Sequence, residues 1–240
     1  IIIHNFETSG VIGLNVVINE YLAVPKLADV GEKVLPTIFM PPLYSYFILA
    51  IKFFLSNDTN LVNIIIILQI LISVLSIFIF YKIINSFGSI KKYSIAFSTI
   101  FSFFPIYIYS VTQISSITLQ IFLVLCFLYL ITLLREGKIL ILILFSFVSG
   151  LLILIRGEFF LFYLLALSYF FLILDRNYKY FLLSIFFTLI VISPYLIRNY
   201  NNYNTVTLTK SFGYNLLKGN NPSLIVEGNS EFIDKKYDRK

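Results

Sequence analysis

Long apolar runs separated by short polar turns dominate the sequence between residues 61 and 197. Residues 61–80 are a long apolar run with Asn63 and Gln69 as its only amides, and residues 93–134 contain no charged residue over 42 positions. As a single helix, 42 residues would measure about 63 Å, twice the ~30 Å hydrocarbon core of a bilayer. We therefore predict that this second run folds back at the polar residues 112–116.

Three shorter apolar runs follow, at residues 139–155, 159–174 and 180–197. Together with the preceding runs they predict six membrane crossings, with Pro105 kinking the second of them. The expected fold class is therefore an all-α integral membrane protein, a polytopic helix bundle whose transmembrane region covers residues 61–197.

The first 60 residues mix charged and apolar positions and predict a long loop. Within it, residues 43–55 are mostly apolar, but thirteen residues fall short of the ~20 that a span needs. We predict a juxtamembrane helix that lies in the interface and begins after Pro41 and Pro42, whose fixed backbone angle suits a first turn. Residues 1–3 resemble the tail of a preceding helix and residues 198–240 a further loop, so the sequence is expected to be a fragment.

Composition supports this interpretation. Hydrophobic residues make up 59% of the chain and charged residues 12%, against about 45–50% and about 25% in soluble proteins. The net charge of +6 does not predict nucleic-acid binding, because the basic residues lie in short turns between apolar runs. His4 and Cys126 are the only residues of their types, so no metal cluster, disulfide framework or histidine triad is expected. No cofactor is predicted, and a divalent cation requirement stays open.

The basic residues also predict orientation. One set of alternate turns holds Lys82, Lys91, Lys92, Arg135, Lys138, Arg176 and Lys179, whereas the intervening turns hold Arg156 and Arg198. Because positive residues favour the cytoplasm, the loop 4–60, the turns at 112–116 and 156–158, and the tail 198–240 are expected on the extracytoplasmic side. The predicted location is the cell (plasma or inner) membrane, which the chain crosses several times.

Polar groups suited to lipid-phosphate chemistry would then share that side. They are Glu7, the MPPLY step with Pro41, Pro42 and Tyr44, Arg156 with Glu158, and Arg198 with Asn199. Guanidinium groups hold phosphate through paired hydrogen bonds, and a carboxylate can take a proton from an attacking hydroxyl.

Each of these groups also has a plainer interpretation. Arg198 can be an interfacial anchor, Arg156 and Glu158 an ion pair across a turn, and the two prolines a helix start. Asn220, in the Gly-Asn-Asn-Pro step, belongs to a turn under either interpretation.

The order of these motifs resembles the GT-C glycosyltransferases related to protein O-mannosyltransferases and aminoarabinose transferases (glycosyltransferase family 39-like). TIFMPPLYSYF at residues 37–47 is similar to the Pro-Pro-Leu-Tyr-Pro step of that group, with Ser45 in place of the second proline. SGLLILIRGEFF at residues 149–160 is similar to its Gly-Leu-x-x-Leu-x-Arg-Pro element, with Gly157 in place of proline. SPYLIRNY at residues 193–200 and the Gly-Asn-Asn-Pro step that follows look like the end of its first membrane bundle.

The resemblance implies a catalytic acid in the first loop. Glu7, 34 residues before Pro41, occupies the place of the family's usual Asp. Glu20, 21 residues before Pro41, is the competing candidate, and both can instead be ordinary solvated carboxylates.

The implied activity is transfer of a sugar from a polyprenyl-phosphate carrier to a lipid, glycan or protein acceptor on the extracytoplasmic side of the bilayer. Arg156 and Arg198 would hold the carrier phosphate, while Pro41, Pro42, Tyr44, Glu158, Asn199 and Asn220 would line the site. Two alternatives remain open. One is a secondary transporter or flippase, and the other is a non-catalytic scaffold subunit of an envelope polysaccharide system.

Overall fold

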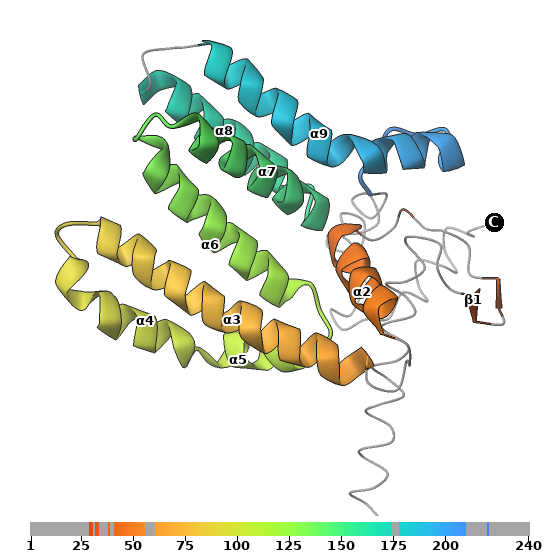
Figure 1. Ribbon diagram of the computed structural model, residues 1–240, viewed down its shortest axis with the longest axis horizontal. Helices are drawn as coiled ribbons and strands as arrows, with labels where there is room; N and C mark the ends of the chain where they lie inside the picture. Colours follow the sequence, from red (N-terminus) through yellow and green to blue (C-terminus); the bar gives the residue numbers. More distant parts are fainter. Residues whose placement is uncertain are drawn as a thin grey trace, which may run out of the picture.

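The computed structural model describes residues 29–30, 32–33, 38, 41–55, 61–173, 178–209 and 220, and these residues are almost entirely helical (Figure 1). The elements in chain order are β1 (Asp29–Val30), β2 (Glu32–Lys33), α2 (Leu43–Phe54), α3 (Leu61–Ser86), the 3₁₀ helix η2 (Lys91–Tyr93), α4 (Ser94–Ser102), α5 (Pro105–Thr112), α6 (Ile117–Leu134), α7 (Ile139–Ile155), α8 (Phe159–Ile173) and α9 (Tyr178–Tyr203). The two short strands pair antiparallel, with Asp29 opposite Lys33, inside the predicted first loop.

Among the described residues, three helices, α3, α6 and α9, are long and apolar enough to cross a membrane. The pair 91–102 and 105–112 would make a fourth span if both parts cross together, while α7 and α8 are apolar but shorter. These helices are consistent with the predicted all-α membrane protein. Of the six predicted crossings, three correspond to helices long enough to span a membrane, or four if the bent pair counts as one span.

The long helices lie side by side, so their connections gather at two ends of the bundle (Figure 1). The turns at 87–93 and 135–138 lie at one end, whereas the turns at 113–116 and 156–158 and the end of α9 lie at the other, beside α2. The polar turn predicted at residues 112–116 is confirmed, because α5 ends at Thr112 and α6 begins at Ile117.

The predicted kink at Pro105 is confirmed. Helix α4 ends at Ser102, and Pro105 begins α5 at an angle of 53° to the preceding helix. Proline suits a first turn because its missing N–H has no partner there in any case. An aromatic stack of Phe80, Phe101 and Tyr107, with ring centroids 4.7 and 4.9 Å apart, joins α3 to both halves of the bend.

Helix α9 continues further than the sequence predicted. Residues 198–203, expected in a loop, form its last turns, and Pro194 lies inside the helix. Proline cannot donate to the carbonyl four residues earlier, here that of Ile190. The Ser193 hydroxyl donates to this Ile190 oxygen at 3.3 Å, so the freed acceptor has a partner and the helix persists.

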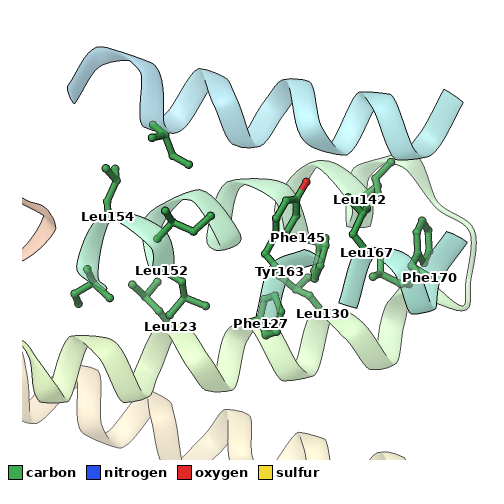
Figure 2. Packing of buried hydrophobic residues seen from close by; sticks show 14 of the residues in the cluster. Leu123, Phe127, Leu130, Leu142, Phe145, Leu152, Leu154, Tyr163, Leu167 and Phe170 are labelled. Atoms are coloured by element: carbon green, nitrogen blue, oxygen red, sulfur yellow. The ribbon is translucent and has the colours of Figure 1, made fainter. Parts of the chain in front are cut away.

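The main core is built by α6, α7, α8 and α9 around α7 (Figure 2). Figure 2 shows Phe127 of α6, Phe145 of α7 and Tyr163 of α8 pointing toward one another, and the rings of Phe127 and Phe145 stack at 5.2 Å. Hydroxyl groups form hydrogen bonds with one another inside this apolar core. Ser184 lies 2.8 Å from Ser146 and 3.0 Å from Tyr163, oxygen to oxygen.

Helix α2 lies across the end of the bundle rather than within it (Figure 1). It begins directly after Pro42, as predicted, and its 12 residues measure about 18 Å. A second apolar cluster of Tyr44, Ile48, Ile51, Leu61, Ile65 and Ile114 joins α2 to α3 and to the α5–α6 turn. Leu43 packs against the main core instead, so α2 contacts both apolar clusters.

Candidate functional site at the α2 end of the bundle

The structure brings most of the predicted site residues to one end of the bundle. Pro41 and Pro42 precede α2, Arg156 and Glu158 lie in the turn after α7, and Arg198 and Asn199 lie near the end of α9. Contacts confirm that these segments are neighbours. The rings of Tyr46 on α2 and Tyr195 on α9 meet edge to face at 6.4 Å.

Arg198 is held by aromatic rings and an amide. Its guanidinium carbon lies 5.6 Å from the ring centroids of both Tyr195 and Tyr203. Its Nη1 donates to Asn199 Oδ1 at 2.7 Å. Cation–π contacts and a hydrogen bond together restrict a side chain that would otherwise have many rotamers. The guanidinium group of Arg198 is therefore held in one position at this end of the bundle.

Asn199 also organises the chain that follows α9. The residue is fully buried, and its Nδ2 donates to the carbonyl oxygen of Thr207 at 2.7 Å. Asn204, with a φ of 52°, turns the chain back after the helix, a conformation that Asn tolerates better than most residues.

The returning segment reaches the turn after α7. The methyl group of Leu208 would lie 3.7 Å from a Cβ placed on Gly157. Residues 204–208 thus lead from the end of α9, which carries Arg198, to the turn that carries Arg156.

Arg156 and Glu158 form only a loose pair. Arg156 Nη1 lies 4.0 Å from Glu158 Oε2, with the side chains 48% and 74% exposed. An exposed pair at this distance contributes little to stability. The ion pair that the plainer interpretation predicted is therefore present but contributes little, and both side chains can also reach solvent.

Tyr44 is buried in the second apolar cluster and bonds to the bundle. Its hydroxyl donates to Gln69 Oε1 at 2.6 Å, and Gln69 Nε2 donates to the carbonyl oxygens of Val111 and Gln113 at 2.9 and 2.8 Å. The position of Tyr44 is thus set by α3 and the end of α5, which makes it a supporting residue of this end.

Three of the predicted site residues cannot be placed relative to this end of the bundle. Glu7 and Glu20, the candidates for the catalytic acid, lie outside the described residues. Asn220 is described as an exposed turn residue, but its sequence neighbours are not described. Within the described ranges no three His, Cys, Asp or Glu side chains gather as a metal site would require.

Several residues that organise this end were not predicted as part of the site. Tyr203 and Tyr195 hold Arg198, and Gln69 holds Tyr44. Gln69 carried the clearest signal, because an amide inside an apolar run must find buried partners. The sequence alone could not show which partners, since they come from positions 25, 42 and 44 residues away.

Comparison with known proteins adds no relative to this picture. No family model matches the chain, and neither a curated protein nor a solved structure matches it. The resemblance drawn from the sequence motifs therefore stays a prediction, and the geometry of this end carries the functional argument.

Proposed function

We propose that the chain is a membrane glycosyltransferase that moves a sugar from a polyprenyl-phosphate carrier to a lipid, glycan or protein acceptor on the extracytoplasmic side. The observation that carries this proposal is the gathering of Arg156, Arg198 and the start of α2 at one end of an apolar bundle. A carrier lipid lies in the bilayer beside such a bundle, with its phosphate at the level of the helix ends.

In the proposed reaction the acceptor oxygen attacks the sugar carbon. A bond forms between these two atoms, the bond from the sugar carbon to the carrier phosphate oxygen breaks, and a carboxylate takes the acceptor proton. Glu7 is the proposed base, with Glu20 as its competitor. The guanidinium groups of Arg156 and Arg198 stabilise the charge that the departing phosphate gains, because planar N–H donors match phosphate oxygens. Arg198 is held by Tyr195, Tyr203 and Asn199 before the reaction, and this orientation contributes to the stabilisation.

The test is transfer by the full-length protein from a polyprenyl-phosphate sugar. We expect Glu7→Gln and Arg198→Ala each to lower transfer by about 100-fold or more, the loss typical of removing a general base or a preorganised charge. Lys138→Ala is the matched control, because Lys138 lies in the turn at the opposite end and pairs with Glu136. Undiminished transfer in both site variants would refute the assignment.

A transporter or flippase remains the second candidate because of the bent pair α4–α5. Broken helices are frequent in transporters, where they surround the substrate. The interior polar groups of α3, α6, α7 and α9 among the described residues are hydroxyls and amides, whereas transporters commonly hold ionisable residues there. Substrate flux in proteoliposomes without a covalent product would favour transport, and a lack of both activities would favour the scaffold role.

A further inference from the structure

Helix α2 is apolar on both of its faces. Tyr44, Ile48 and Ile51 form the face buried against α3, and the opposite face carries Tyr46, Ala50, Phe53 and Phe54, all exposed. Phe53 and Phe54 are each 82% exposed. Apolar contacts are non-directional, so hydrophobic burial alone does not select which face of α2 turns toward the bundle.

The hydrogen bonds of Gln69 supply the missing direction. Gln69 is 1% exposed and accepts from the Tyr44 hydroxyl while donating to two carbonyls at the end of α5. Val111 lies in the last turn of α5 and Gln113 caps it, and carbonyls at a helix C-terminus have no partner within the helix. With α2 turned over, the Gln69 oxygen would lose its donor inside an apolar cluster, which is costly.

We propose that Gln69 is the positioning residue for α2, selecting through Tyr44 the single orientation in which this helix closes the α2 end of the bundle. Buried polar residues fix the register of coiled coils in the same way, by leaving the alternative arrangement unpaired. Only one part of this inference rests on the proposed function, namely that α2 forms a wall of the sugar-transfer site. The docking of α2 itself requires no catalysis.

The test measures the orientation of α2 by cross-linking. Tyr46→Cys and Tyr195→Cys, whose native rings lie 6.4 Å apart, would be joined by a short bis-maleimide in a full-length protein lacking Cys126. Tyr44→Phe, which removes only one hydroxyl, and Gln69→Leu should each lower the equilibrium constant for the native orientation about fivefold, the change that loss of one hydrogen bond produces, and should lower the cross-link yield with it.

Two further variants separate positioning from general damage. Gln120→Leu makes the same substitution in α6, at a half-buried glutamine whose side chain forms no hydrogen bond within the described ranges, and should keep the yield. Gln69→Glu, protonated at this buried position, keeps an oxygen that accepts from Tyr44 but can donate to only one of the two carbonyls, so it should restore part of the yield lost in Gln69→Leu. If Gln69→Leu fails to fold, the cross-link yield of Tyr44→Phe alone tests the proposal.

An unchanged yield in Tyr44→Phe would overturn the proposal, and so would an equal loss in Gln120→Leu. Because the cross-link needs no turnover, a reduced yield in the variants together with no sugar transfer by the protein that keeps Tyr44 and Gln69 would leave the positioning role standing and refute the proposed function. An unchanged yield together with normal transfer by that protein would refute the positioning role and leave the proposed function standing.

Discussion

At the scale of single residues, the buried hydroxyls fall into two groups. Hydroxyls inside the bundle bond either to a carbonyl one turn earlier or to a neighbouring helix, as those of Ser76, Ser98 and Ser149 do. Others near the α2 end, including those of Ser45 and Ser115, are buried without a hydrogen-bond partner in the described part of the chain. A buried hydroxyl without a partner costs free energy, so this end is less optimised for stability than the rest of the bundle.

Two fully buried serines test this difference. Ser45 and Ser146 are both 0% exposed, but the Ser146 hydroxyl donates to the Leu142 carbonyl and lies 2.8 Å from Ser184 Oγ. We expect Ser146→Ala to lower the free energy of unfolding by about 0.5–1.5 kcal/mol. Ser45→Ala should leave it unchanged or raise it.

Denaturant titration in detergent micelles would measure both variants. Because each change is Ser to Ala within a helix, the difference in helix propensity cancels between them. Equal destabilisation by the two substitutions would show that Ser45 does have a partner.

At the scale of secondary structure, the sequence predicted where helices lie better than where they end. Apolar runs and Pro105 predicted α3, the bend and α6, because these signals act within a few residues of the structure they cause. Helix α9 extends past the predicted boundary at residue 197 and keeps Pro194 inside it, where the Ser193 hydroxyl gives the Ile190 carbonyl a partner. Side-chain bonds of this kind depend on rotamers, which an apolar pattern does not contain.

Packing of α7 on α9 depends on one position without a side chain. A Cβ on Gly150 would lie 2.7 Å from the Cβ of Val191 and 3.3 Å from the Thr188 carbonyl oxygen. Alanine favours a helix by about 1 kcal/mol over glycine, but this contact forces the two helices apart, and overpacking costs about 1–3 kcal/mol.

We therefore expect Gly150→Ala to lower the melting temperature, with partial recovery in the double variant with Val191→Gly. Gly88→Ala is the control, because nothing lies within 4 Å of a Cβ there. Thermal unfolding followed by circular dichroism would measure these variants. A melting temperature raised by Gly150→Ala would mean that α7 and α9 are not packed this closely.

At the scale of the whole molecule, the alternation of turns explains why distant polar residues become neighbours. Arg156 and Arg198 are 42 positions apart in the sequence, and one antiparallel pair of helices, α8 and α9, returns the chain to the same end (Figure 1). The run lengths alone predicted this grouping. The aromatic support of Arg198 and the chain reversal at Asn204 could not be predicted, because both require the three-dimensional path after α9.

The most direct test of the account is the sidedness of this end in the membrane. Single cysteines at Asp29, Asp58, Glu158 and Asn202, in a full-length protein lacking Cys126, should react with a membrane-impermeant maleimide on intact cells. Cysteines at Ser89 and Glu136, in the turns at the opposite end, should react only after permeabilisation. Labelling of Asp29 and Asp58, which flank α2, from opposite sides would contradict the account, as would labelling of Glu158 and Asn202 from opposite sides.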